Sequence, residues 1–290
     1  MNNKKSIFKI LSSFFMIFVL VGCGKNKENS LSNISSKAEN VNVSYINVGK
    51  GDAILVQIDD KNYLIDTGLE ENSEMLLEGL KAKDVDTLDG VFLTHTHKDH
   101  IGGMEAVAAA YDIEMMYRAE ISENKKNGEN KIDNLSEDLY LPITKLNAGD
   151  KVKITDDIYF DVIGPLVLNE DDDNDNSLVM KLVVNGKTFL FTGDMQFAEE
   201  KTLMDAGVDL SSDILKVGNH GNKDATSDEF AIAVSPKYSV ITTDTTVDTN
   251  SASKRVRKAL SNSEIYITED YDRGITFTVL QDGTIEIAEF

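Results

Sequence analysis

Apolar and polar residues alternate along much of the chain from Val41 onward, and a period of two is typical of strands that bury one face. Val41–Ile46 is the first such run, residues 53–58 follow it after a turn with two glycines, and residues 63–68 form a third run that ends in a turn. A helical period of about 3.6 then takes over. Ser73 is typical of a helix N-cap, and an apolar stripe follows it at Met75, Leu76, Leu77 and Leu80.

The same two patterns continue to the end of the chain. They predict helices at Met104–Ala110, 197–206, 227–234 and 251–260, a hairpin at 151–163, and strands at 113–117, 178–184, 188–192, 213–218, 238–243, 264–268, 274–280 and 284–290. Residues 119–140 are polar and without a period, so we expect an irregular segment there, either a lid near a site or a surface insertion. Because strands followed by helices occur twice, we predict an α/β fold of layered sheets with helices outside, and a site between two similar halves.

The N-terminus shows neither pattern. Three lysines precede an apolar run at residues 10–21, and about 12 residues are too few to span a bilayer but suit the core of a signal peptide. The run ends in Leu-Val-Gly-Cys, which resembles the bacterial lipobox, so we predict a signal peptide over residues 1–22 and lipidation of Cys23. This is the only cysteine, which excludes a disulfide within the chain. Residues 23–40 are predicted to be a flexible tether to a domain at 41–290.

Composition and charge narrow the classes of protein that fit. Hydrophobic residues make up 41% of the chain, enough for a core, and 50 acidic against 29 basic residues give a formal net charge of −21. Because phosphate backbones are bound by lysine and arginine, we expect no stable complex with nucleic acid. We interpret the acidity as the solvated surface of an exported protein that faces outward and is held at the cell membrane by its lipid alone. No protein partner is predicted.

Three of the four histidines fall within one hexapeptide, HTHKDH at 95–100, after the apolar run that ends near residue 94. On an extended strand, residues two apart face the same side, so His95 and His97 can offer two imidazoles to one ion. Asp99 and His100 follow where the chain turns into a helix, and they can reach a second ion. The two glycines that come next allow close backbone packing beside them.

Two further candidates follow other strands. Asp194 comes after the strand at 188–192 and a glycine, and His220, the remaining histidine, follows the strand at 213–218. Side chains at the ends of neighbouring strands meet at one edge of a sheet. A carboxylate can bridge two cations, and two cations about 3.5–4 Å apart suit hydrolysis because they lower the pKa of a bridging water and polarise the bond under attack. The alternative for Asp194 is a turn-capping carboxylate.

Taken in order, the hexapeptide at 95–100, Gly193-Asp194 and His220-Gly221 resemble motifs of the metallo-β-lactamase fold superfamily, over about residues 42–290. This resemblance implies a four-layer αβ/βα sandwich and a metal-dependent hydrolase. Finer motifs are similar to the ComEC-type branch, the metallohydrolase domain tied to the DNA-uptake channel, here as a stand-alone lipoprotein, and they imply a nuclease linked to competence. These motifs are NVGKGDA (47–53), LIDTG (64–68), LTHTHKDHIGG (93–103), NSLV (176–179) and LKVGNHG (215–221).

The resemblance can be carried over residue by residue. It implies six metal ligands: His95 and His97 for a first ion, Asp99, His100 and His220 for a second, and Asp194 as a bridge. It makes Asp99 and Asp194 the catalytic residues, and Asp66 a residue that orients the ligands from behind.

The sequence departs from the family pattern in two ways. Many members have a further histidine before the strand that leads to Gly-Asp, and DNDNS at 173–177 occupies that place here. The first site is thus one imidazole short, and it is either weaker or completed by an oxygen ligand. We expect two divalent cations, zinc first, with manganese as the alternative that an oxygen ligand favours. Asn47 and Lys50 replace an aspartate and a glutamine of the family, and Asn219 and Asn222 flank His220-Gly221 where the family has histidine and serine. These changes affect the identity of the substrate more than the binding of metals.

We therefore predict an extracytoplasmic, lipid-anchored, metal-dependent hydrolase of phosphodiester bonds, in nucleic acid or a nucleotide, that acts through a metal-bound hydroxide. Two alternatives stay open: a hydrolase of another ester or a lactam, and a non-catalytic metal-binding lipoprotein that uses the fold as an interaction module. The presence of all six candidate ligands argues against the last. The prediction requires that Asp194 and His220 lie beside the hexapeptide.

Overall fold

The computed structural model describes residues 37–39, 41–122 and 129–290. The predicted signal peptide, Cys23 and nearly all of the predicted tether lie outside the described residues. Within the described ranges, no helix has both the length and the apolar character needed to cross a bilayer. The first strand begins at Val41.

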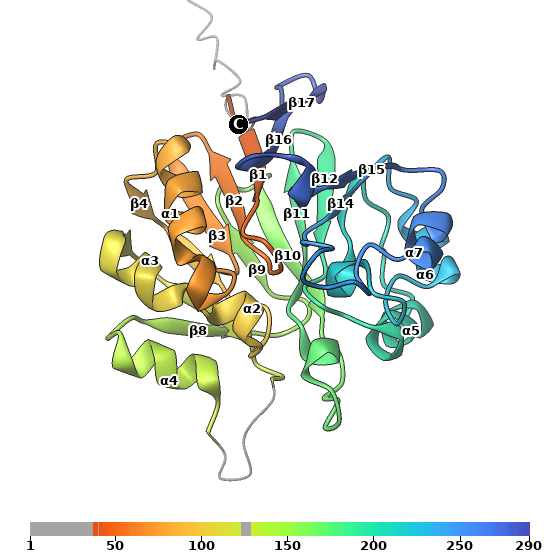
Figure 1. The fold of residues 1–290 in the computed structure, drawn as a ribbon, viewed down its shortest axis with the longest axis horizontal. Helices are drawn as coiled ribbons and strands as arrows, with labels where there is room; N and C mark the ends of the chain where they lie inside the picture. Colours follow the sequence, from red (N-terminus) through yellow and green to blue (C-terminus); the bar gives the residue numbers. More distant parts are fainter. Residues whose placement is uncertain (1–36, 40, 123–128) are drawn as a thin grey trace, which may run out of the picture. The chain divides into compact units, whose positions relative to one another are not determined.

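Two large mixed sheets dominate the described part of the chain (Figure 1). The first runs in the order β17-β16-β1-β2-β3-β5-β7-β8, with β1 (Val41–Ile46), β2 (Ile54–Ile58), β3 (Lys61–Ile65), β5 (Gly90–Phe92), β7 (Met116–Ala119), β8 (Ile143–Leu146), β16 (Gly274–Val279) and β17 (Ile285–Glu289). The second runs β15-β14-β13-β12-β11-β10-β9, with β9 (Lys151–Lys153), β10 (Tyr159–Gly164), β11 (Val179–Val184), β12 (Lys187–Phe191), β13 (Ile214–Lys216), β14 (Tyr238–Ile241) and β15 (Glu264–Ile267). Two short strands, β4 (Thr87–Leu88) and β6 (Asp112–Ile113), pair separately.

The two sheets pack face to face, and helices cover their outer faces. Aromatic side chains from both sheets fill the space between them, among them Tyr45, Phe92, Phe160 and Phe277. The first sheet is covered by α1 (Ser73–Ala82), α2 (Lys98–Ile101), α3 (Met104–Ala110) and α4 (Lys131–Asp138), and the second by α5 (Phe197–Asp205), α6 (Asp228–Val234) and α7 (Lys254–Ala259) (Figure 1). Burial of apolar surface in three clusters, one between the sheets and one beneath the helices on each side, stabilises the fold. The predicted four-layer sandwich is confirmed.

The prediction of an irregular segment at 119–140 is wrong in its second half, because α4 lies there. The side chain of Asn130 caps this helix by accepting hydrogen bonds from the backbone N–H groups of Ile132 and Asp133. Ile132 is fully buried against the first sheet, and Leu135 and Leu139 pack beside it. An apolar stripe of three residues in a polar stretch is too weak a periodic signal to predict such a helix.

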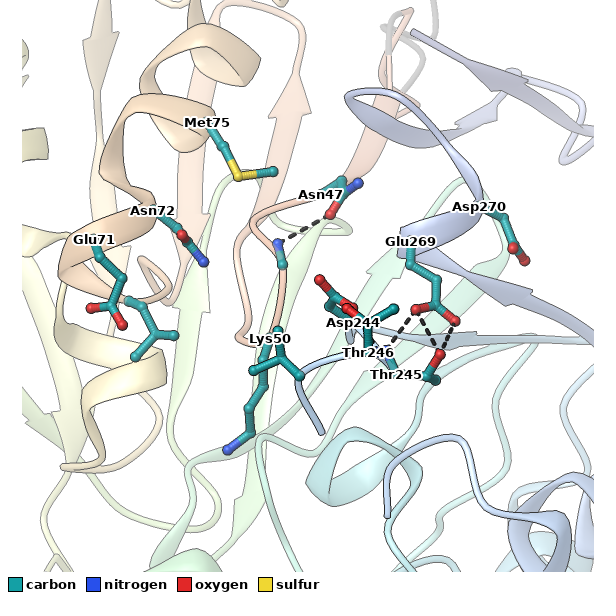
Figure 2. Close-up of a pocket in the computed structure, with 13 residues that line it drawn as sticks. Asn47, Lys50, Glu71, Asn72, Met75, Asp244, Thr245, Thr246, Glu269 and Asp270 are labelled. Carbon is teal, nitrogen blue, oxygen red and sulfur yellow. Dashed lines mark hydrogen bonds between the residues drawn. The ribbon is translucent and has the colours of Figure 1, made fainter. Parts of the chain in front are cut away.

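The strands that precede the predicted site residues end at one edge of the sandwich. β3 and β5 are parallel neighbours in the first sheet, and β12, β13 and β14 are parallel neighbours in the second. Their carboxyl ends therefore point the same way within each sheet, and the segments that follow them can meet. A cavity of about 740 Å³ lies between the loop after β1, the segment that leads into α1 and the loop after β14 (Figure 2).

Candidate metal centre

The histidine motif leaves the sheet earlier than predicted. β5 ends at Phe92, and residues 95 and 96 form a bend before α2 begins. His95 and His97 therefore do not project from an extended strand, and that part of the prediction is wrong. Their rings still meet, edge to face, with centroids 4.6 Å apart.

Two buried carboxylates draw the chain out of the sheet at this bend. Asp66 accepts hydrogen bonds from the backbone N–H (2.8 Å) and hydroxyl (2.7 Å) of Thr94, and Asp173 accepts from the N–H (2.9 Å) and hydroxyl (2.7 Å) of Thr96. The second oxygen of Asp66 also lies 2.8 Å from Nδ1 of His100. This arrangement fits the orienting role predicted for Asp66, since a carboxylate at Nδ1 leaves Nε2 facing the site.

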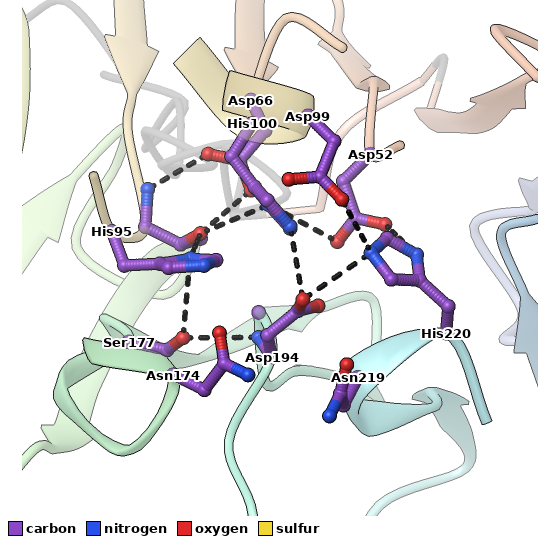
Figure 3. A network of polar contacts seen from close by, with 12 residues as sticks. Asp52, Asp66, His95, Asp99, His100, Asn174, Ser177, Asp194, Asn219 and His220 are labelled. Atoms are coloured by element: carbon purple, nitrogen blue, oxygen red, sulfur yellow. Dashed lines mark hydrogen bonds and ion pairs between the residues drawn. The ribbon is translucent and has the colours of Figure 1, made fainter. Parts of the chain in front are cut away.

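Four of the six predicted ligands lie together at the sheet edge (Figure 3). Asp99, His100, Asp194 and His220 each offer an atom that lies within 4.8 Å of the others. One oxygen of Asp194 lies 3.2 Å from Nε2 of both His100 and His220, and one oxygen of Asp99 lies 3.4 Å from Nε2 of His220. The predicted convergence of residues 95–100 with Asp194 and His220 is therefore present.

The other two predicted ligands lie beside this group. His95 is fully buried, and its ring centroid is 4.1 Å from that of His100 and 4.6 Å from that of His97. The hydroxyl of Ser177 lies 3.4 Å from Nδ1 of His95 and accepts a hydrogen bond from the backbone N–H of Asp194. Ser177, which belongs to the stretch that replaces the family's further histidine, thus contacts Nδ1 of His95 and not its Nε2 atom.

The unpaired atoms in this region fit a pair of divalent cations. Nε2 of His95, His100 and His220 and Oδ1 of Asp194 are buried and have no hydrogen-bond partner among the described residues, although His100 and His220 lie within ion-pair distance of Asp194. Buried polar atoms are nearly always bonded, so four such atoms in one place indicate ligands rather than packing. Imidazole nitrogen and carboxylate oxygen are the atoms that bind zinc and manganese in proteins.

The side chains also shift one another's pKa values. Burial opposes charge on His220 and His100, but the carboxylate of Asp194 outweighs it, raising the pKa of His220 to about 9 and that of His100 well above its usual range. Burial would raise the pKa of Asp99, but the imidazole of His220, 3.4 Å away, and the charge of His100 hold it well below its usual range. Burial and the neighbouring charge of His100 lower the pKa of His95, which favours the neutral form that binds metals. Protons and cations therefore compete for these nitrogen atoms.

Three residues of the site have left-handed backbone conformations that side chains other than glycine seldom adopt. The φ angles are 59° at Asp66, 43° at Asn219 and 51° at His220. His220 is held in place because its Nδ1 lies 2.7 Å from the carbonyl oxygen of Thr242 and its own carbonyl accepts from the N–H of Ala252 at 3.0 Å. Such strain costs about 1–3 kcal/mol per residue and is typical of functional sites.

Close backbone contacts surround the hexapeptide, as its following glycines predict. A Cβ atom at Gly103 would lie 2.2 Å from the carbonyl oxygen of Thr67, so no side chain fits there. At Gly51, where φ is 144°, a Cβ would lie 2.7 Å from the carbonyl oxygen of Asp99. The loops after β1 and β3 can therefore pack directly on α2 and fix the ligands that it carries.

Sequence reasoning missed a buried lysine at this centre. Lys216, at the end of β13, is fully buried, and its ammonium contacts Asp52 and lies 2.8 Å from the carbonyl oxygen of Gly193 and 3.6 Å from Oδ1 of Asp194. Burial opposes its charge, but Asp52 and Asp194 outweigh burial and raise the pKa of Lys216. The pair ties the loop after β1 to the second sheet, directly behind Asp194. A lysine within an otherwise apolar strand, ILKV at 214–217, was the available signal.

Comparison with known proteins agrees with this geometry. The family model of the metallo-beta-lactamase superfamily matches residues 46–243. The chain therefore belongs to the metallo-β-lactamase superfamily, whose members are generally metal-dependent hydrolases with a dinuclear site for divalent metals. The fold is similar to that of the metallo-beta-lactamase fold protein YhfI from Bacillus subtilis, with a TM-score of 0.55 and 13% identity over 83% of this chain and 99% of that one.

Within the superfamily, the relatives fit the ComEC-type branch, which confirms the resemblance. The chain is 29% identical over 228 residues to ComE operon protein 3 of Bacillus subtilis, covering 72% of this chain and 28% of that one. It is 28% identical over 205 residues to competence protein ComA of Neisseria gonorrhoeae, covering 68% and 26%. A shorter match, 32% over 63 residues, is to exodeoxyribonuclease YycJ of Bacillus anthracis, covering 22% and 24%. The chain thus spans about a quarter of the length of these relatives.

Proposed function

We propose that this chain is an exported, lipid-anchored hydrolase of phosphodiester bonds that works with two divalent cations. The observation that carries the proposal is the position of Asp194, one oxygen of which lies 3.2 Å from Nε2 of both His100 and His220. A carboxylate so placed suits a bridge between two cations, and paired cations suit phosphoester hydrolysis. The exodeoxyribonuclease among the relatives supports this choice of substrate. Export and lipidation of Cys23 rest on the sequence alone.

The six candidate ligands would form two neighbouring cation sites. His95 and His97 would hold one cation, Asp99, His100 and His220 the other, and Asp194 would lie between them. When bound, the cations supply the Lewis acidity that activates water and offsets the charge that gathers on the phosphate.

Residues behind the ligands fix their orientation. Asp66 and the carbonyl oxygen of Thr242 lie 2.8 Å and 2.7 Å from Nδ1 of His100 and His220, respectively, so that both Nε2 atoms face the site. The ammonium of Lys50, 3.1 Å from an oxygen of Asp99, is placed to contact an anionic substrate oxygen at the mouth of the centre.

Metal analysis together with hydrolysis of bis(p-nitrophenyl) phosphate tests the hydrolase. After loading with zinc or manganese, we expect close to two ions per chain and a rate that a chelator abolishes. His97→Ala and Asp194→Asn should each lower that rate at least about 100-fold, because even residues behind metal ligands cost about 10–100-fold. Asp156→Asn is the matched control, since this side chain is 96% exposed in the turn before β10.

Bound metal without hydrolysis of any phosphodiester would contradict the proposal. Activity on thioesters or lactams alone would show that the protein hydrolyses another kind of ester or an amide bond. No activity at all would favour an interaction module. The anchor is tested separately: Cys23→Ala should move the protein from the membrane fraction and remove the lipid from the mature N-terminus, detected by mass spectrometry.

A further inference from the structure

The cavity in Figure 2 lies next to the candidate metal centre and is large enough for a small molecule. Its volume of about 740 Å³ falls within the range of ligand sites, about 300–1,000 Å³. Of the described residues that line it, none is one of the six candidate ligands. It is therefore a separate space, and it can hold a part of the substrate that the metal centre does not cleave.

One lysine joins the cavity to the metal centre. The side chain of Lys50 lines the cavity and is 33% exposed, and its ammonium lies 3.1 Å from Oδ2 of Asp99. The same oxygen of Asp99 lies 3.4 Å from Nε2 of His220. A phosphate at the metal centre would therefore reach the positive charge at this end of the cavity.

Negative charge dominates the remainder of the lining. Against the single ammonium, the described lining residues include four carboxylates: Glu71, Asp244, Glu269 and Asp270. Hydrogen bonds from Thr246 hold the pKa of Asp244 below its usual range, and Glu269 is fixed by the backbone N–H (2.6 Å) and hydroxyl (2.9 Å) of Thr245. Glu71 and Asp270 lie on opposite sides of the cavity in Figure 2. The lining of the cavity thus has its one ammonium, which is paired with Asp99, at the metal end and carboxylates elsewhere.

Two more observations connect this cavity to substrate choice. Asn47 and Lys50, the two positions at which the first loop departs from the motif of the ComEC-type branch, both line it. Met75 and Val247 expose 39% and 68% of their surface and also line it. Methyl and methylene groups suit these apolar contacts, whereas a second phosphate would meet carboxylates.

We propose that the cavity binds a positively charged arm of the substrate, so that the cleaved compound is a zwitterionic phosphodiester. Its phosphate lies beside Lys50 and its ammonium group lies among the four carboxylates. This proposal rests on the proposed hydrolase function. In the reaction, the oxygen of water bonds to phosphorus, the P–O bond to the leaving alcohol breaks, and a proton passes from the water to the departing oxygen.

A polynucleotide fits this cavity poorly. Each further phosphate of the chain would approach fixed carboxylates, and Coulomb's law gives a penalty of roughly two-fold per charge pair at about 8 Å in water. The four carboxylates together therefore discriminate by roughly ten-fold or more between a cationic and a neutral arm. Since exposed charges are screened, this preference falls as the salt concentration rises.

The test compares two esters that release the same p-nitrophenol. p-Nitrophenyl phosphorylcholine carries a quaternary ammonium, and the p-nitrophenyl ester of thymidine 5′-monophosphate carries a neutral nucleoside. With the metal-loaded protein, we expect kcat/KM for the choline ester to exceed that for the thymidine ester at least ten-fold. Direct binding provides a second measurement: by calorimetry, phosphocholine should bind more tightly than thymidine 5′-monophosphate.

Two pairs of variants assign the preference to the cavity. Neutralising Glu71→Gln and Asp270→Asn together should lower the ratio of the two kcat/KM values about four-fold. The control pair Asp156→Asn and Asp157→Asn removes the same charge in the turn before β10, at the opposite end of the sheet, and should leave the ratio unchanged.

The outcomes separate this inference from the function on which it rests. If the thymidine ester or oligonucleotides are cleaved with a kcat/KM equal to that of the choline ester, the zwitterionic substrate is refuted, while the proposed phosphodiesterase function is not. If the ratio changes equally in both pairs of variants, the cavity is not its source and the inference is refuted. If neither ester is cleaved by metal-loaded protein, the hydrolase of phosphodiesters and this inference are both refuted.

Discussion

Replacing Lys216 by methionine isolates the buried ion pair behind the metal centre. The substitution keeps an unbranched apolar stem but leaves the carboxylate of Asp52, which is only 1% exposed, without its ammonium partner. Breaking a buried pair from one side costs about 3–5 kcal/mol. Asp52 keeps a hydrogen bond from Thr242 and lies 3.8 Å from Nδ1 of His100. We therefore expect the free energy of unfolding to fall by about 3 kcal/mol, the lower end of the range.

Changing both partners separates the unpaired charge from the lost packing. Adding Asp52→Asn to Lys216→Met removes the charge, so the double variant should be about 2 kcal/mol more stable than Lys216→Met alone. This difference lies within the usual range of interaction energies between contacting residues. Lys181→Met is the matched control in the same sheet. Lys181 is also buried, but its partner Asp209 is 77% exposed, so the lost ion pair should cost less than about 1 kcal/mol.

Urea unfolding with a chelator present, followed by circular dichroism because the chain has no tryptophan, measures these differences. The reasoning is refuted if Lys216→Met costs no more than Lys181→Met. It is also refuted if the double variant is less stable than Lys216→Met alone, because the charge of Asp52 would then not be the source of the loss.

Two further variants test the surroundings of the site. Burial, together with the charge of Asp175, raises the pKa of Glu199 from 4.5 to about 7, so this group stabilises the protein fully below pH 4.5 and loses that contribution as the pH rises through 7. At about 1.4 kcal/mol per pKa unit this is roughly 3 kcal/mol, and Glu199→Gln should remove that part of the fall in unfolding free energy between pH 5 and 8; an unchanged fall would contradict it. Asp66→Asn weakens the support of His100 and should lower metal affinity about 10–100-fold by calorimetry, whereas an unchanged affinity would exclude an orienting role.

The hexapeptide could be predicted because its ligands are neighbours in the sequence. His95, His97, Asp99 and His100 reveal themselves by residue type and spacing alone. Asp194 could be placed from the rule that parallel strands end at one edge, together with the family motif. These inferences need no knowledge of side-chain packing, and the structure brings Asp99, His100, Asp194 and His220 together as predicted, although His95 and His97 do not lie on a strand.

Apart from Asp66, which the family resemblance indicated, the supporting residues could not be predicted because their partners lie far away in the sequence. Asp173 holds the backbone of Thr96, and Asp52 pairs with Lys216 across the two sheets, yet each looks like an ordinary charged residue in its own segment. The bend after β5 is likewise held by the distant carboxylates of Asp66 and Asp173, whereas local propensity favoured a continued strand. Such contacts follow only from the packed fold.

The division of ligands between the sheets links the fold to the chemistry. Residues 95–100 follow a strand of the first sheet, whereas Asp194 and His220 follow strands of the second. The contact between Lys216 and Asp52 joins the same two sheets just behind the candidate ligands. The left-handed backbone at His220 is held by contacts within the second half, from Thr242 and Ala252, whereas the approach of Asp194 to His100 at 3.2 Å requires both halves. The candidate metal centre is therefore a property of the assembled sandwich, and a sequence motif in either half identifies only part of it.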